Sequence, residues 1–231
     1  MPKLTTARKR LSEVGWLSRQ PLQFRENLLG RCEFRTFGRG ENLYGLDDPP
    51  GGVYGLAEGF VDVLVASGVG SPFLGFIGGP GWWVGEAAAI TATHRRADIR
   101  ARTTTEVLYL PFAEFQKLAA ADPRAFRCFA ELTIDHMDNA LMLASTLAAT
   151  NTRDRIISTL YRLAGAFREI DDTIKLPCTQ SEIAEMAGLS RNSVSPIMGA
   201  LASEGLVQHG RNRVSYNPVR LGRALNFQND V

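Results

Sequence analysis

Residues 179–206, with the sequence TQSEIAEMAGLSRNSVSPIMGALASEGL, decide the fold of the C-terminal part of this chain. Apolar residues recur at helical spacing on both sides of Gly188, a residue that readily takes the left-handed conformation in which helices end. Ser190, two residues later, can cap a following helix with its hydroxyl group. The stretch therefore predicts two short helices joined by a tight turn, which is a helix-turn-helix.

The second predicted helix carries short polar side chains and one guanidinium group on the face opposite Val194, Met198 and Leu201. Such groups suit the phosphates and base edges of a DNA major groove. We therefore predict that the residues of this helix that bind DNA are Ser190, Arg191, Asn192, Ser193 and Ser195.

Two strand-like runs follow the helix pair, Gly205–His209 and Arg213–Tyr216, around a turn at residues 210–212. Such a hairpin is the wing of a winged helix-turn-helix. Arg211 and Arg213 at its tip are placed to neutralise phosphates, although two solvated surface arginines would explain them equally well if each is taken singly. The basic hairpin and the helix pair together favour DNA binding.

The N-terminal part has a different texture. From Phe34 to Leu110 the chain is rich in glycine and in β-branched or aromatic residues, and turn signals recur about every 8 to 12 residues. This pattern predicts an antiparallel β-roll, and residues 1–30 form a short helical lead-in. The predicted fold class is α+β, with a sensor-like roll at 1–121, a long helix at 122–150 and the winged domain at 151–231.

The long helix begins where Asp122 can cap it and Pro123 can occupy its first position. Its apolar stripe continues for about seven turns, which is typical of either a buried spine or a dimer contact. We favour the dimer, because one winged domain covers few base pairs and a two-fold pair covers two half-sites about 34 Å apart. Residues 150–152 break the helix and form a candidate hinge. The predicted dimer residues are Phe126, Phe129, Met137, Leu141, Ala144 and Leu147.

Composition narrows the function classes. The 231 residues carry a net charge of only +2, so DNA affinity has to come from local placement of charge.

No apolar run reaches the length of a membrane span, which predicts a cytoplasmic protein without membrane contact. The cysteines are odd in number, far apart and without Cys-x-x-Cys spacing, so neither disulfides nor a zinc or iron–sulfur site is expected. No catalytic motif is present, and we expect no enzyme.

The arrangement resembles the cyclic-AMP receptor protein and fumarate-nitrate regulator (CRP/FNR) superfamily of bacterial transcription factors. The resemblance implies a homodimer in which a β-roll senses a ligand, the long helix transmits the signal, and winged domains bind a palindromic promoter site and contact RNA polymerase. It covers nearly the whole chain and rests on Gly40-Glu41, residues 54–59, Gly85-Glu86, Arg95 with Ala97, Arg100-Ala101, the long helix, Arg155-Ile156, Gly188, Ser190-Arg191 and Val194-Ser195.

Carried over residue by residue, the family's cyclic-nucleotide pocket matches only in part. Gly85 and Glu86 stand where the ribose hydroxyl is bound, and Arg95 stands where the cyclic phosphate is bound. The next position, usually Ser or Thr, is Arg96. The long-helix positions that contact adenine become Ala140 and Leu141, which offer no hydroxyl group. Because unanswered donors cost about 1 to 3 kcal/mol each, cyclic AMP is not the expected effector.

Three alternatives remain for this pocket. Glu86 and Arg95 could pair with each other and close a relic site, or Arg95, Arg96 and His94 could hold another acidic ligand. Haem is a weaker alternative, since His94 is the only imidazole expected nearby, and we predict no cofactor. Oxidation of Cys178, just before the DNA-binding unit, is a further weak hypothesis.

The second helix of the helix-turn-helix also departs from the family. Arg191 is retained, but the usual Glu is Asn192, which suits adenine, and a later Arg is Pro196. Pro196 lacks a backbone donor and is expected to kink the helix or spoil DNA binding. The resemblance places Gln180 on a phosphate, and Thr179 beside it completes the predicted DNA-binding residues. The alternative function is a dimeric ligand-binding interaction module that no longer binds specific DNA.

Overall fold

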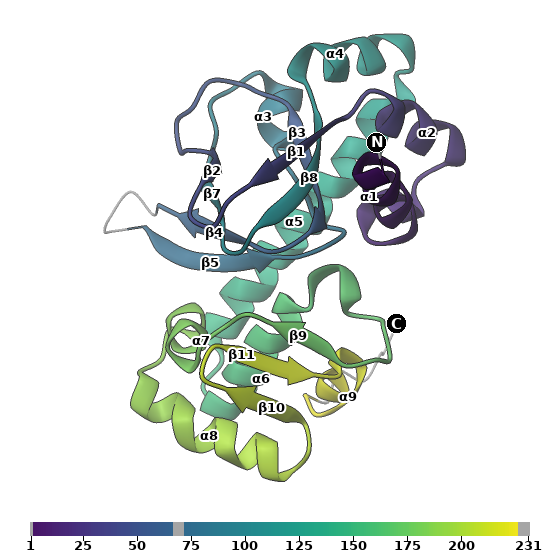
Figure 1. Cartoon of the computed structure of the whole chain (residues 1–231). Coiled ribbons are helices and arrows are strands. Elements are labelled where there is room, and N and C mark those ends of the chain that lie inside the picture. The colour runs from purple at the N-terminus through teal and green to yellow at the C-terminus, as the bar shows by residue number, and fades with distance from the viewer. Residues whose placement is uncertain (1, 67–71, 226–231) are drawn as a thin grey trace. The chain divides into compact units, whose positions relative to one another are not determined.

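The computed structural model describes residues 2–66 and 72–225, and the chain forms two compact units, Met1–Met137 and Asp138–Val231 (Figure 1). Each unit has its own sheets and core and is described by itself. Helix α5 (Arg124–Ala148) contributes residues to both units. Among the described residues, no helix is both long and apolar enough to cross a membrane.

The described part of the first unit contains two four-stranded sheets, and every strand pairing in them is antiparallel. The α+β fold with an antiparallel roll is confirmed. One sheet has the order β1 (Glu33–Phe37), β8 (Thr105–Leu110), β3 (Val53–Glu58), β6 (Trp83–Val84), and the other has the order β2 (Asn42–Tyr44), β7 (Asp98–Ala101), β4 (Val61–Val65), β5 (Phe73–Gly78).

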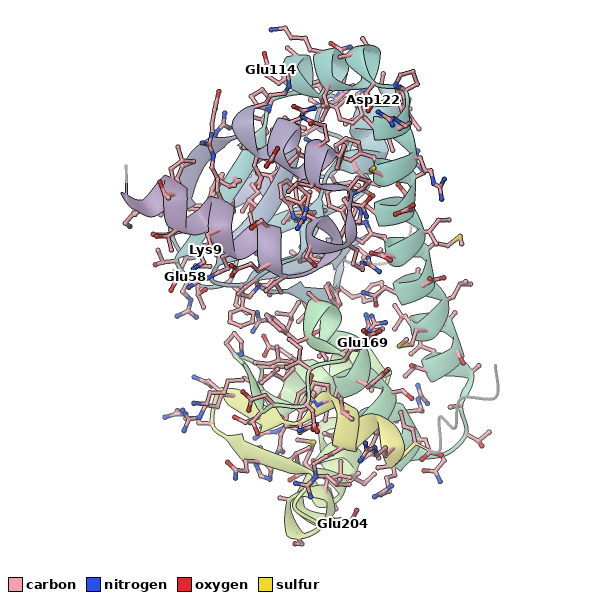
Figure 2. The ribbon with its side chains drawn as sticks, turned by 90° about the vertical axis from the view of Figure 1, so that its right-hand side faces the viewer. Lys9, Glu58, Glu114, Asp122, Glu169 and Glu204 are labelled. Carbon is pink, nitrogen blue, oxygen red and sulfur yellow. The ribbon has the colours of Figure 1, made fainter. Side chains whose placement is uncertain are left out.

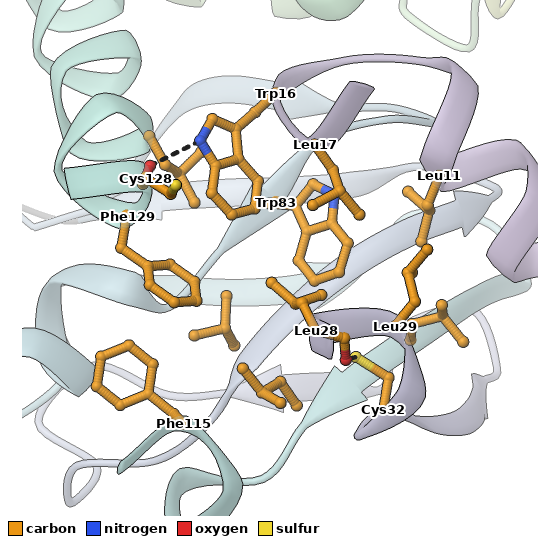
Figure 3. Close-up of a cluster of buried hydrophobic side chains, with 14 of the residues drawn as sticks. Leu11, Trp16, Leu17, Leu28, Leu29, Cys32, Trp83, Phe115, Cys128 and Phe129 are labelled. Carbon is orange, nitrogen blue, oxygen red and sulfur yellow. Dashed lines mark hydrogen bonds between the residues drawn. The ribbon is translucent and has the colours of Figure 1, made fainter. Parts of the chain in front are cut away.

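The helical lead-in predicted for residues 1–30 is confirmed, and it packs on the roll. Trp16 and Leu17 are buried in the core of the unit, and the Trp16 indole Nε1 donates a hydrogen bond to the Cys128 carbonyl at 2.9 Å (Figure 3). Two further helices, α3 and α4, are present that the sequence pattern did not predict. The helices of this unit are α1 (Pro2–Glu13), the 3-10 helix η1 (Trp16–Arg19), α2 (Leu22–Gly30), α3 (Glu86–Thr91) and α4 (Phe112–Ala121).

The buried face of α5 requires one correction. Phe129 is 0% exposed and packs against the rings of Trp16, Phe24 and Phe115 (Figure 3). It belongs to the core of its own unit, so the prediction that Phe129 contacts a partner chain is wrong. Phe129 lies on a different face of α5 from the other predicted dimer residues, and the sequence does not separate them because an apolar stripe looks the same whether it packs inside the chain or against another one.

Within the second unit, the chain breaks between α5 and α6 close to the predicted position. Helix α5 ends at Ala148, and the Asn151 side chain accepts hydrogen bonds from the backbone N–H groups of Arg153 and Asp154 to start α6 (Thr152–Leu163). Buried residues of α6, among them Ile156 and Leu160, form the core. The remaining elements are the 3-10 helix η2 (Gly165–Phe167), β9 (Ile174–Leu176), α7 (Gln180–Ala187), α8 (Arg191–Ser203), β10 (Val207–Gly210), β11 (Arg213–Tyr216) and α9 (Pro218–Arg223).

A third strand, β9, completes the wing and was not predicted. The sheet order is β10-β11-β9, with Val214 opposite Leu176. The Tyr216 hydroxyl donates a hydrogen bond to the Leu160 carbonyl at 2.5 Å in the core. The wing is therefore anchored to α6 through β11.

Candidate nucleic-acid interface and sensor site

The turn of the helix-turn-helix forms for local reasons. Thr179 and Glu182 make a reciprocal capping box at the start of α7, with the Glu182 N–H donating to the Thr179 hydroxyl at 3.2 Å. Gly188 ends α7 with φ of 62°. A Cβ at this position would lie 2.8 Å from the Arg155 Nη2 atom, which donates to the Gly188 carbonyl at 3.2 Å. The predicted role of Gly188 as a left-handed helix end is confirmed.

Helix α8 buries one face and exposes the other. Val194, Met198 and Leu201 are fully buried, whereas the predicted polar residues from Ser190 to Ser195 are exposed on the other side. The hydroxyl of Ser190 accepts a hydrogen bond from the Ser193 N–H at 3.2 Å and so caps the helix as predicted. Arg191 and Asn192 occupy the first turn and are exposed.

The wing hairpin is tighter than predicted. Gly210 pairs with Arg213, so the turn consists of Arg211 and Asn212 alone, and the first strand begins at Val207 rather than at Gly205. Arg211 and Arg213 are both exposed at the tip. Two-residue hairpin loops are a common solution because their twist matches that of the strands.

One contact at this surface had no counterpart in the sequence analysis. The Gln180 Nε2 atom lies 3.2 Å from the Nδ1 atom of His209 on β10. The two residues are 29 positions apart, and no motif links them, so only the fold brings them together. The contact joins the start of α7 to the wing.

Helix α8 continues through Pro196 and ends at Ser203, so the proline does not terminate it. The burial of residues on both sides of Pro196 explains its tolerance, since tertiary packing supplies most helix stability. Glu204 lies directly after α8 (Figure 2). Its carboxylate accepts a hydrogen bond from Arg153 Nη2 at 2.5 Å. The predicted kink at Pro196 stays a prediction.

The sensor site of the first unit is defined here as Tyr44, Glu86, Arg95, Thr133 and His136. Arg95 is 4% exposed, and its guanidinium donates to the carbonyls of Gly52 at 2.8 Å and Gly85 at 3.1 Å. It also lies over the Tyr44 ring, 4.1 Å from the centroid. A Cβ on Gly85 would stand 2.6 Å from Arg95 Nη1, which explains a glycine at that position.

Glu86 is 2% exposed, and side chains of α5 contact its carboxylate. Its Oε1 atom lies 3.0 Å from Nδ1 of His136 and accepts a longer hydrogen bond, 3.5 Å, from the Thr133 hydroxyl. Burial lowers the pKa of His136, but the charge and hydrogen bond of Glu86, with Asp135 and the Trp83 backbone, raise that pKa above 6.5 overall. The Glu86 carboxylate therefore favours the protonated form of the His136 imidazole.

Two expectations about this site need correction. Among the described residues, Glu86 pairs with His136, and Arg95 pairs with backbone carbonyls, so the predicted relic pair of Glu86 with Arg95 is wrong. His94 is also not the imidazole nearest to the site, because His136 contacts Glu86 directly. The sequence could not show this, since fifty residues separate the two partners.

The other predicted pocket residues are exposed. Arg96 and His94 are exposed, unlike Arg95, so neighbours in sequence point to different environments. Ala140 and Leu141 are exposed on the part of α5 that belongs to the second unit. The described residues contain no group of three or more His, Cys, Asp or Glu that could hold a metal ion. Cys178 is 1% exposed, which leaves its oxidation hypothesis without an accessible thiol.

Comparison with known proteins identifies both units. Residues 34–122 match the cyclic nucleotide-binding domain family, and residues 154–222 match the Crp-like helix-turn-helix domain family. The chain belongs to the CRP/FNR family of transcription regulators. Regulators with this helix-turn-helix bind promoter DNA.

Relatives of similar length support this assignment. The "cAMP-activated global transcriptional regulator CRP" of Pasteurella multocida is 26% identical over 83% of this chain and 93% of its own, and that of Haemophilus influenzae is 24% identical over 81% and 86%. Among solved structures, FixK2 from Bradyrhizobium japonicum has a TM-score of 0.69 at 21% identity, covering 83% of this chain and 96% of its own. The CRP/FNR fold is therefore present over both units.

Proposed function

We propose that this CRP/FNR-family protein is a homodimeric regulator that binds a palindromic promoter site through α8 and the wing, without cyclic AMP as its natural effector. The observation that carries the DNA part is the exposed first turn of α8. It presents Arg191 and Asn192, while the wing of the same unit exposes Arg211 and Arg213. Base-edge donors and phosphate-neutralising charges are the two components that specific DNA binding needs.

The proposed DNA-binding residues divide by their present partners. Thr179 and Ser190 use their hydroxyl groups to cap α7 and α8, and Gln180 contacts His209. We assign these three to phosphates or to positioning, and Arg191 and Asn192 to base edges. Ser193 and Ser195 complete the exposed polar surface.

The dimer proposal rests on the exposed side of α5. Met137 is 48% and Leu141 59% exposed, which is unusual for large apolar residues outside an interface. The exposed apolar residues follow one another at steps of three and four, as in a coiled-coil seam. Ile134, which is exposed, replaces the buried Phe129 as a residue of this seam. The proposed seam is Phe126, Ala130, Ile134, Met137, Leu141, Ala144 and Leu147.

The effector proposal rests on the sensor site. The Oε1 atom of Glu86 already has His136 and Thr133 as partners, so a ligand hydroxyl would compete with them for the carboxylate. Arg96, at the position where relatives of the family offer a small hydroxyl, is exposed. This competition, together with the missing hydroxyl at position 96, lowers the free-energy gain expected from binding a cyclic nucleotide. Some other acidic ligand at Arg95 remains the second candidate.

We further propose that the protein acts in the cytoplasm, contacts RNA polymerase at its promoters and has no catalytic activity. These assignments follow from membership of a family of transcription regulators. Whether it activates or represses depends on surface contacts with polymerase.

Salt-dependent binding tests the DNA part most simply. The purified protein is titrated against a mixed-sequence duplex at salt concentrations from about 50 to 200 mM, a range over which phosphate-driven affinity falls steeply. We expect that the double variant Arg211→Ala/Arg213→Ala lowers the salt slope by about 2, roughly one unit per lost phosphate contact. The matched control is Arg220→Ala on α9, an exposed arginine outside the proposed surface. Binding that does not respond to salt would support the interaction-module alternative.

Sedimentation tests the dimer. Met137→Asp with Leu141→Asp places two charges on the proposed seam and should yield monomers at concentrations where the wild type is dimeric. The control is Arg127→Asp, a more exposed position of the same helix outside the seam. A dimer that survives both changes would refute the seam.

A further inference from the structure

We call the exposed face of α8 its recognition surface. Few long side chains lie on it. Its thirteen residues, RNSVSPIMGALAS, contain one charged residue, Arg191, and one amide, Asn192. Beyond the first turn, the exposed residues are Ser195, Pro196, Gly199, Ala200 and Ser203. A Cβ added at Gly199 would meet nothing within 4 Å, so this part of the surface is open.

Pro196 occupies a distinctive place on this surface. It lies four residues after Asn192, so the two side chains are neighbours on one face of the helix. That face is the exposed one, because Val194, Met198 and Leu201 point to the core and both Asn192 and Pro196 are exposed. An exposed pyrrolidine ring next to an exposed amide is therefore what a bound duplex would meet in the middle of α8.

The chemistry of these two groups matches one kind of base pair. An Asn side chain forms a bidentate pair with N6 and N7 of adenine, and an apolar side chain contacts the C5-methyl group of thymine. The adenine N6 and N7 atoms and the thymine methyl group are all accessible in the major groove. Because Pro196 has no N–H, it also cannot act as a backbone donor there.

We infer that Asn192 and Pro196 determine specificity together, Asn192 by binding an adenine and Pro196 by packing on the methyl group of a nearby thymine. This inference rests on the proposed DNA binding through α8. Residues four apart are separated by about 6 Å along a helix, and base pairs by about 3.4 Å. The adenine and the thymine therefore lie within two base pairs of each other in each half-site.

The geometry also accounts for a proline inside a recognition helix. The helix stays continuous because its other face is anchored in the core. The ring then adds a rigid apolar surface that loses no rotamer entropy on binding, unlike a long polar side chain. Small neighbours at Gly199 and Ala200 let the ring approach the floor of the groove.

The test uses base analogues in a duplex first selected from a randomised pool by the wild-type protein. Each thymine is replaced in turn by deoxyuridine, which removes only the methyl group, and each adenine by 7-deazaadenine, which removes only the N7 acceptor. We expect one thymine per half-site at which the replacement weakens binding about threefold to fourfold, since burying one such carbon contributes about 0.8 kcal/mol. One adenine within two base pairs should show a tenfold or larger loss.

Two variants assign the effects to residues. Pro196→Ser should abolish the sensitivity to deoxyuridine at that thymine, and Asn192→Ala should abolish the sensitivity to 7-deazaadenine. The other thymines and adenines of the same duplex are internal controls. The wild-type scan stands without the variants, so a variant that fails to fold does not prevent the test.

The outcomes separate this inference from the proposed function. If no duplex is selected from the pool, the proposed DNA binding fails. If a site is selected but no thymine responds to deoxyuridine, or the response persists in Pro196→Ser, the inference is overturned while DNA binding stands.

Discussion

The sensor site and the recognition surface hold their polar groups in opposite ways. In the first unit, Glu86 and Arg95 are buried, and the chain itself supplies partners through His136 and backbone carbonyls. In the second unit, Arg191 and Asn192 are exposed. Burying a charge is costly unless it is paired, whereas an exposed group can exchange water for a ligand at little cost. The difference indicates a sensor site whose carboxylate and guanidinium groups have partners without a ligand, and an exposed surface whose polar groups are free to contact DNA.

Helix α5 shows the same contrast between a buried face and an exposed face. A substitution on its buried face gives the largest expected change in stability. Phe129 lies in the aromatic core, while Met137 is exposed. We expect Phe129→Ala to lower the free energy of unfolding by about 3–5 kcal/mol, as for other buried aromatic residues. Chemical denaturation at several protein concentrations measures this loss.

Met137→Ala is the matched control for that experiment. It should lower the midpoint only where the wild type is a dimer, because subunit association adds to the apparent stability. Equal, concentration-independent losses for both variants would mean that the two faces of α5 are not distinct.

The substitution Arg191→Ala on the exposed surface of α8 gives the next largest expected effect, a loss of DNA affinity. We expect binding to the selected site to weaken by about 1–3 kcal/mol, while binding to mixed-sequence DNA changes little, since a base contact contributes to specificity and not to charge neutralisation alone. Anisotropy titrations with both duplexes measure the two affinities. A uniform loss across sequences would reassign Arg191 to a phosphate.

Ser190→Ala distinguishes capping from DNA contact. The Ser190 hydroxyl accepts a hydrogen bond from the Ser193 N–H, and loss of such a cap typically costs about 1 kcal/mol of stability. Thermal unfolding should show this loss, whereas Ser195→Ala, an exposed position within the helix, should leave stability unchanged. If Ser190→Ala weakened only DNA binding, its hydroxyl would be a DNA contact and not a structural cap.

The smallest expected effect is the pH dependence of the sensor unit. The pKa of His136 is raised above 6.5 in the folded chain, so the stabilisation from the Glu86 pair is fully present below pH 6.5 and is lost as the pH rises through the raised value. Stability measured from pH 6 to 9 should therefore fall more in the wild type than in Glu86→Gln.

Nuclear magnetic resonance titration of His136 checks the same cause directly. Burial is the largest single influence on the pKa of His136, and without the Glu86 charge and hydrogen bond to outweigh it that pKa should fall below 6.5 in Glu86→Gln. An unchanged pKa would show that Glu86 is not the partner that holds the proton.

Local signals explain most of what the sequence predicted. The ends of α7 and the start of α8 depend on Thr179, Gly188 and Ser190, each of which acts on its own helix end. The break before α6 likewise depends on Asn151. The fold class followed because these elements occur in an order that few folds share.

The sequence could not predict which face of α5 packs against the core, nor which distant residues that face contacts. A helical stripe that includes Phe129 and Met137 looks continuous, and only packing decides that one faces the core and the other faces outward. The pairing of Glu86 with His136 depends on the same rotation and spans fifty residues. Strand β9, three residues long, was too short to stand out from its flanks.

The most direct test of the account is selection of bound duplexes from a randomised pool by the purified protein, in parallel without effector and with cyclic AMP. Because Glu86 and Arg95 have partners within the chain itself, we predict that the same palindrome is enriched in both arms. Enrichment that requires cyclic AMP would contradict the account, since the nucleotide would then be the effector despite the partners that Glu86 and Arg95 already have.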